Sequence, residues 1–250
     1  MNSIVTADVP AAARTLAIFE TFGAERRPLS LSELARLADI PVSSCHSLMR
    51  TLERRGFLHF LSAREAYPTR KMLDVATAIN AHDPIALRLA PALAALRDET
   101  GETVILGSRQ GNAALYLLVL ESAQTVRYTA RAGEHKPLHS SSIGKVLLAE
   151  MAPDDLDSWI SNDPLKRATP QTITSARQLK RDLEESRLRG WFVTRGENVT
   201  DVMAIAAPLH FGGITLGVAI AGPMHRMVDV ERRQSQRLLT AIKAIERQNA

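Results

Sequence analysis

The chain has 250 residues, of which 45% are hydrophobic and 23% charged, with a formal net charge of +4 at pH 7; this is typical of a globular protein of one or two domains. Its single cysteine, Cys45, excludes an intrachain disulfide and argues against a cysteine-based zinc site. No signal peptide is recognised and no apolar run approaches the roughly 18 residues of a membrane span, so we expect a cytoplasmic protein without a membrane partner.

Two helices are predicted near the N-terminus. The spacing of apolar residues predicts a helix over residues 10–22, which Gly23 is expected to end. A second helix is expected to open at Ser30. Ser30 and Glu33 form the S-x-x-E pattern of a capping box, in which each side chain satisfies a backbone N–H of the first turn.

A third helix, predicted over residues 41–55, is the strongest functional indication. Pro41 suits its first position, where no backbone N–H is needed. The side facing the core carries Cys45, Leu48, Met49 and Leu52. The opposite side and its flanks carry Ser43, Ser44, His46, Ser47, Arg50 and Arg54. Hydroxyl, imidazole and guanidinium groups suit phosphate oxygens and base edges, so we predict that this side enters a DNA groove.

A hairpin is predicted directly after this helix. A strand is expected over residues 57–61, followed by a turn and by the returning strand of the hairpin at residues 66–67. A helix-turn-helix followed by a hairpin is a winged helix, and Arg64 at the tip of the wing could reach the DNA backbone or minor groove. We therefore predict a winged helix-turn-helix domain over residues 1–68. The alternative is an ordinary three-helix domain with a solvated polar face.

A linker helix is predicted over residues 69–83, interrupted at Asp83 and Pro84. A second helical pattern follows, in which Pro91 is expected to kink or restart the helix. The apolar stripe of this connector needs a partner, either the following domain or a second subunit. Two-fold DNA sites favour a second subunit, so we expect a homodimer or homotetramer.

The remaining residues, 84–250, are predicted to form an α+β domain. Strands are expected over residues 103–108, 113–120, 125–130, 191–195, 202–210 and 214–221. Helices are expected from residues 140–142 through 148, and over residues 153–160, 174–189 and 228–247. Strands at both ends with helices between them favour an antiparallel sheet.

Four segments in order, residues 29–58, 101–118, 131–149 and 187–223, resemble the IclR family of bacterial transcription regulators. The resemblance covers nearly the whole chain. It implies a winged helix-turn-helix, a linker helix and an effector domain with a PAS/GAF-like antiparallel sheet. It also implies a homo-oligomer that binds double-stranded operator DNA and responds to a small molecule, often a carboxylate or an aromatic acid.

The resemblance also locates an effector pocket. In the family, the loop corresponding to residues 138–144 and the helix it opens line this pocket. Free N–H groups of Ser142, Ile143 and Gly144 at the N-terminus of this helix would hold an anion. Where the family often has polar side chains, this chain has Thr194, Ala204, Ala219 and Ala221. We therefore expect a ligand with a carboxylate at residues 140–144 and an apolar or aromatic body against the alanines. The expected effector-binding residues are Leu138, Ser140, Ser142, Ile143, Gly144, Thr194, Ala204, Ala219 and Ala221. The alternative is that the alanines are ordinary core residues.

One departure concerns DNA recognition. The family often has Arg where this chain has Ser47, so we expect a different operator sequence.

No metal, cofactor or enzyme site is predicted. Pro137 lies between His135 and His139 and breaks the helix that would align them on one metal. The segment SSSIGKV lacks the leading glycine of a phosphate loop and has Val146 in place of the magnesium-binding hydroxyl. The alternatives to a regulator are an architectural DNA-binding protein without an effector and a metabolite-processing enzyme.

Overall fold

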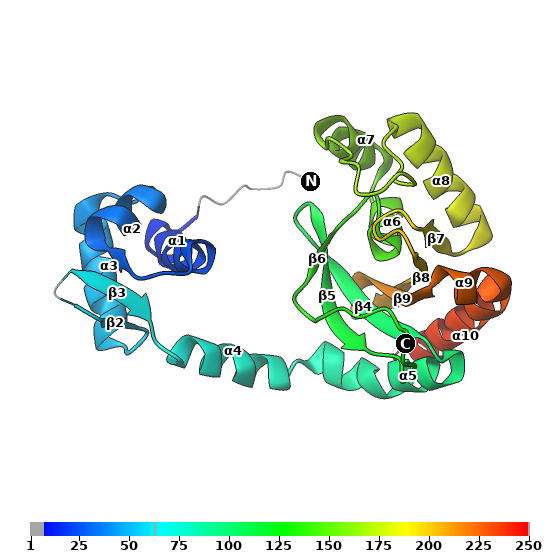
Figure 1. The fold of residues 1–250 in the computed structure, drawn as a ribbon, viewed down its shortest axis with the longest axis horizontal. Helices are drawn as coiled ribbons and strands as arrows, with labels where there is room; N and C mark the ends of the chain where they lie inside the picture. The colour runs from blue at the N-terminus through cyan, green and yellow to red at the C-terminus, as the bar shows by residue number, and fades with distance from the viewer. Residues whose placement is uncertain (1–7, 63, 250) are drawn as a thin grey trace. The chain divides into compact units, whose positions relative to one another are not determined.

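The computed structural model describes residues 8–62 and 64–249, which fall into two compact units that divide between Asp83 and Pro84. Figure 1 shows the helices and strands of the two units. Each unit has its own hydrophobic core. Within the described ranges, no helix is long and apolar enough to span a bilayer.

The first unit is a winged helix-turn-helix followed by one more helix. Its helices are α1 (Pro10–Glu25), α2 (Leu31–Leu37), α3 (Val42–Arg54) and α4 (Lys71–Ala81). Its wing contains β1 (Leu29–Ser30), β2 (Leu58–Phe60) and β3 (Glu65–Pro68), in the order β1-β3-β2. The core beneath α3 includes Ile18, Leu34, Cys45, Met49 and Leu58.

The helix boundaries of this unit confirm one prediction and correct two. The capping box is present, because the Ser30 hydroxyl accepts from the Glu33 amide and the Glu33 carboxylate accepts from the Ser30 amide. The prediction that Gly23 ends α1 is wrong, since one helical glycine costs only about 1 kcal/mol and the chain leaves the helix at Arg26 instead. Pro41 lies at the N-cap of α3, with extended ψ, rather than inside its first turn.

The second unit opens with α5 (Pro84–Thr100), which runs through Pro91 without a break. The prediction that Pro91 restarts the helix is therefore wrong. The N–H that proline lacks would have donated to the carbonyl of Leu87, whose residue is exposed, so water can replace the lost bond.

A six-stranded antiparallel sheet forms the centre of this unit, in the order β6-β5-β4-β9-β8-β7. The strands are β4 (Thr103–Gln110), β5 (Ala113–Leu120), β6 (His135–Pro137), β7 (Phe192–Arg195), β8 (Val202–Phe211) and β9 (Ile214–Pro223). The α+β class with an antiparallel sheet is confirmed. The strand predicted over residues 125–130 is absent, and β6 occupies that edge of the sheet. Backbone carbonyls of residues 125–130 accept hydrogen bonds from side chains instead of from a neighbouring strand. The Thr103 hydroxyl donates to the Tyr128 carbonyl at 2.6 Å, and the Arg226 guanidinium donates to the Val126 carbonyl at 3.0 Å.

Helices cover both faces of the sheet (Figure 1). On one face, α5 and α10 (Glu231–Asn249) pack over Val104, Leu106 and Val218. The helix expected from residue 228 begins at Glu231, after α9 (Met224–Met227) and the 3-10 turn η1 (Val228–Val230). The other face carries α6 (Ser142–Ala149), α7 (Pro153–Asn162) and α8 (Ala176–Arg189). The candidate effector site lies on this second face.

Candidate DNA-binding surface and effector cavity

Helix α3 presents the predicted polar side chains to solvent. Ser43, His46, Ser47, Arg50 and Arg54 are exposed, and Ser44 is half-buried. The helix is held in this orientation because Cys45, Met49 and Leu52 on its other side are buried in the core of the unit. The structure thus places the six α3 residues of the predicted DNA-binding set along one side of a single helix.

Arg50 is oriented toward the wing. Its guanidinium lies 2.8 Å from a Glu53 carboxylate oxygen and 5.5 Å from the centre of the Phe60 ring. A surface groove runs between α3, the start of α2 and the wing, and it is lined by both Arg50 and Arg64. The two arginines, predicted separately from a helix and a turn, therefore share one groove.

Sequence reasoning missed several polar groups around this surface. Ser30, Ser32 and Ser62 also line the groove. Arg14 of α1 donates to the Ser44 hydroxyl at 3.4 Å, which brings a further cation to the start of α3. No spacing within α1 marks Arg14, because its proximity to α3 depends on how the helices pack.

A small cavity, partly open to solvent, lies on the second face of the sheet. Its polar lining comprises Tyr116, Tyr128, Ser141, Ser142, Thr194 and Asn198. Its apolar lining comprises Ile105, Val199, Val202, Ala204, Ala219 and Ala221. None of the described residues that line it is Lys, Arg, Asp or Glu.

The N-terminus of α6 opens beside this cavity. The Ser141 hydroxyl caps the helix: it accepts from the Gly144 amide at 3.2 Å and donates to the Pro137 carbonyl at 2.6 Å. The Gly144 amide is therefore occupied, which corrects the expectation that it is free. Among the described residues no acceptor pairs with the amides of Ser142 and Ile143.

The predicted effector residues divide into two groups. Ser142, Thr194, Ala204, Ala219 and Ala221 line the cavity. Leu138, Ser140, Ile143 and Gly144 do not line it and are buried around the start of α6.

Known proteins match both units. Residues 11–62 match the IclR helix-turn-helix domain, and residues 77–248 match the C-terminal domain of the bacterial transcriptional regulator IclR. The chain belongs to the IclR family of transcriptional regulators. The expected fold and class of function are thereby confirmed: the chain is an IclR-type transcriptional regulator with a DNA-binding helix-turn-helix, and regulators of this family bind small-molecule effectors.

Individual relatives span most of the chain. The HTH-type transcriptional regulator BhcR of Paracoccus denitrificans is 34% identical over 206 residues, which is 80% of this chain and 73% of that protein. The IclR structure from Thermotoga maritima is 27% identical with a TM-score of 0.67, covering 96% of this chain and 99% of that one. An IclR homolog from Microbacterium hydrocarbonoxydans, complexed with 4-hydroxybenzoate, is 23% identical with a TM-score of 0.70, covering 94% of this chain and 99% of that one.

The cavity of this IclR-family chain also contains residues that sequence reasoning missed, above all Tyr116, Tyr128 and Asn198. Burial raises the pKa of the Tyr116 phenol above its ordinary value, and Tyr128 and Glu134 raise it further. Tyr116 alternates with Leu115 and Leu117 along β5, a pattern that could have placed it on the cavity face. Tyr128 lies outside any strand, so periodicity gives no signal for it.

Proposed function

We propose that an organic acid with one carboxylate and an apolar or aromatic body binds in the cavity and controls operator binding. The observation that carries this proposal is the chemical division of the cavity wall. One part holds the start of α6 and several hydroxyls, and another part is made of Ala204, Ala219 and Ala221.

The carboxylate would lie at the first turn of α6. Backbone N–H groups and the helix dipole attract negative charge at such a position, and the Ser142 and Ile143 amides have no acceptor among the described residues. With no cation in the described lining, neutral donors would supply the rest of the stabilisation.

The alanine methyl groups would contact the body of the ligand. A small dicarboxylate or hydroxy acid would leave polar groups without partners there, at a cost of about 1–3 kcal/mol each. 4-Hydroxybenzoate has one carboxylate on an aromatic ring, as the proposal requires. It is bound to a solved IclR homolog with a similar fold, and it serves here as a probe compound.

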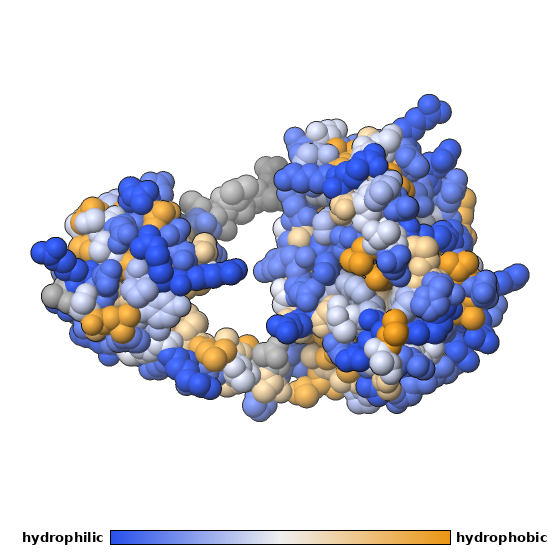
Figure 2. All heavy atoms as spheres, viewed as in Figure 1, coloured by the Kyte–Doolittle hydropathy of each residue, from blue (hydrophilic) through white to orange (hydrophobic). Residues whose placement is uncertain are grey.

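We propose that two copies of the chain bind one operator together through their DNA-binding surfaces. Two copies of α3 would enter successive major grooves with Ser43, Ser44, His46, Ser47, Arg50 and Arg54, and Arg64 would contact DNA from the wing. Leu73 and Ile79 of α4 are 56% and 69% exposed. Figure 2 shows hydrophobic surface along this segment, interspersed with hydrophilic side chains. An exposed apolar helix of this kind supports a homodimer or homotetramer. Effector coupling of about 1–3 kcal/mol is typical of such switches.

We further propose that the protein is a regulator without catalytic activity and acts in the cytoplasm, where operator DNA lies. A nucleophilic role for Ser141 is disfavoured, because its hydroxyl donates to the Pro137 carbonyl rather than to a base. His139 is also engaged, with its ring nitrogen 3.0 Å from the Lys166 carbonyl.

A thermal-shift screen tests the effector proposal. The purified protein is heated with small aliphatic carboxylates and with aromatic carboxylates, because a ligand that binds the native state raises the melting temperature. Shifts confined to aromatic or apolar acids support the proposal. Shifts confined to small dicarboxylates or hydroxy acids contradict the proposed class, and no shift with either set favours a DNA-binding protein without an effector.

A further inference from the structure

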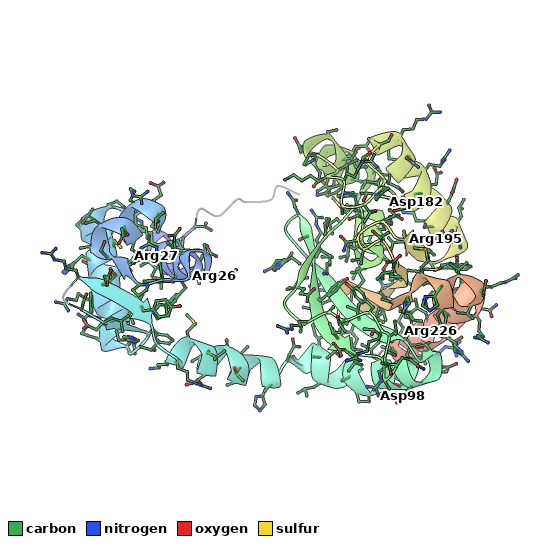
Figure 3. All side chains as sticks on the ribbon, in the orientation of Figure 1. Arg26, Arg27, Asp98, Asp182, Arg195 and Arg226 are labelled. Atoms are coloured by element: carbon green, nitrogen blue, oxygen red, sulfur yellow. The ribbon has the colours of Figure 1, made fainter. Side chains whose placement is uncertain are left out.

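A cluster of three charged groups lies inside the effector domain, outside the DNA-binding surface and outside the cavity lining. The Lys145 ammonium is fully buried, 2.7 Å from Glu197 Oε1 and 2.8 Å from Asp182 Oδ2. Figure 3 labels Asp182 on α8, beside α6, which carries Lys145. One buried cation thus joins α6, α8 and the segment between β7 and β8.

The cluster is an inefficient way to stabilise a core. Taking charges out of water costs free energy that their attraction often fails to recover, and an apolar set of similar volume frequently packs as well. Glu197 Oε2 is buried and has no hydrogen-bond partner among the described residues. Burial raises the pKa of the Glu197 carboxyl, Asp182 adds to this, and Lys145 opposes it.

The connection between β7 and β8 is held in place by this cluster and by two threonines. Thr169 and Thr172 each donate a hydroxyl hydrogen bond of 2.6 Å, to the carbonyls of Gly196 and Glu197 respectively. The threonines hold the backbone of residues 196–197, while Lys145 holds the side chain of Glu197.

The next two residues enter the cavity wall. Asn198 and Val199 follow Glu197 directly and line the cavity. Lys145 itself lies one turn after Ser142, which lines the cavity from α6. The ion pair therefore connects two parts of the wall that are far apart in sequence.

We propose that Lys145 and Glu197 are positioning residues that fix residues 196–199 and so hold Asn198 and Val199 in the wall of the cavity. This inference rests on the proposed function only in naming that cavity the effector site. Neither residue is expected to touch the ligand.

The first test measures the segment without any ligand. The amides of Gly196 and Val202 donate to the carbonyls of Val202 and Val199, so their hydrogen exchange reports on the loop. In the full-length protein, Lys145→Met is expected to accelerate exchange in residues 195–202 by on the order of tenfold relative to the rest of the sheet. The matched control is Lys180→Met, which removes an exposed ion pair to Asp157 and should leave this exchange unchanged. Acceleration spread evenly over the domain, or none, overturns the proposal.

A double variant separates positioning from simple charge compensation. Lys145→Met combined with Glu197→Leu removes both charges of this pair and leaves only Asp182, whose side chain is 28% exposed, without its cation. The melting temperature should therefore recover in part relative to Lys145→Met alone. Fast exchange in residues 195–202 should persist, because the directional contact is still missing. Recovery of slow exchange together with stability would contradict a positioning role.

Ligand binding gives the second readout. With 4-hydroxybenzoate as the probe, calorimetry should show affinity reduced by about tenfold in the double variant and unchanged in Lys180→Met. Unchanged affinity in the double variant would overturn the proposal. If the unmodified protein fails to bind the probe, that result counts against the proposed ligand class, and the exchange measurement still decides the role of Lys145.

Discussion

Gly144 lies so close to Leu138 that a Cβ atom at position 144 would be 2.3 Å from the Leu138 carbonyl oxygen. The same atom would lie 2.6 Å from the Ser141 hydroxyl, which caps α6. The loop before α6 therefore folds back onto the first turn of the helix, and only glycine leaves room for this. The arrangement also sets the start of α6 beside the cavity.

The substitution Gly144→Ala should destabilise the effector domain. The added methyl group meets backbone atoms that cannot move independently, and overpacking of this kind costs about 1–3 kcal/mol. Urea unfolding of the full-length protein measures the change. The control is Gly23→Ala in α1, where a Cβ atom has no neighbour within 4 Å and stability should rise by about 0.5–1 kcal/mol. Full stability of Gly144→Ala would disprove the close packing.

Filling the cavity should abolish effector binding without loss of DNA binding. Ala204 lines the cavity from β8, between Thr194 of β7 and Ala221 of β9. A leucine at this position would occupy the space proposed for the body of the ligand, so affinity for an aromatic acid should fall by at least about tenfold. Calorimetry gives this affinity, and operator binding by the ligand-free variant is the control. Undiminished ligand affinity would mean that the acid binds elsewhere.

Local patterns predicted much of the fold. The capping box at Ser30 and Glu33 and the turn at Gly190 involve residues within a few positions of each other, and both mark helix ends in the structure. Helical spacing alone also predicted which side of α3 is buried and which is exposed. In the structure Cys45 and Met49 are buried and Arg50 is exposed.

Long-range contacts account for what the sequence did not reveal. Tyr128 reaches the cavity on a loop whose backbone is bound by Thr103 and Arg226, side chains distant in the sequence. Lys145 and Glu197 are separated by 52 positions, and nothing in the neighbourhood of either indicates the other. Pairings of this kind depend on the packed fold, so periodicity and motif spacing give no signal for them.

The exposed apolar side of α4 should mediate self-association. Replacing Ile79, which is 69% exposed, with Asp would place a charge on this surface and shift the protein toward monomers. Sedimentation velocity measures the change in mass. Val126→Asp is the matched control, because Val126 is 62% exposed but lies in the effector domain away from α4 in the sequence. An unchanged oligomer in Ile79→Asp would exclude this part of α4 from the interface.

Arg50→Ala should weaken operator binding. Arg50 is exposed on α3 and lines the groove beside the wing, so its loss should cost about 1–3 kcal/mol if it reads a base. If Arg50 binds a phosphate instead, the slope of the logarithm of the binding constant against the logarithm of the salt concentration should decrease in magnitude by about one. Fluorescence anisotropy on operator DNA at several salt concentrations distinguishes the two contacts. The control, Arg181→Ala on the exposed side of α8, should bind normally; normal binding by Arg50→Ala would mean that this side of α3 is misassigned.

The capping box makes the DNA-binding domain sensitive to acid. Hydrogen bonds from the Ser30 amide and hydroxyl, followed by one from Arg27, lower the pKa of the Glu33 carboxyl from 4.5 to about 2. Because the folded-state pKa is the lower one, the stabilisation is complete above about pH 4.5 and is lost as the pH falls toward 2.

Glu33→Gln isolates this contribution, because glutamine matches the protonated carboxyl in shape and carries no charge. The unmodified protein should melt at a higher temperature than the variant near neutral pH, and the difference should shrink toward zero as the pH falls through that window. Thermal unfolding at a series of pH values measures the difference. The control is Glu20→Gln, which replaces an exposed carboxylate of α1. Its melting temperature should equal that of the unmodified protein at every pH. A difference for Glu33→Gln that stays constant with pH would show that its charge does not stabilise the start of α2.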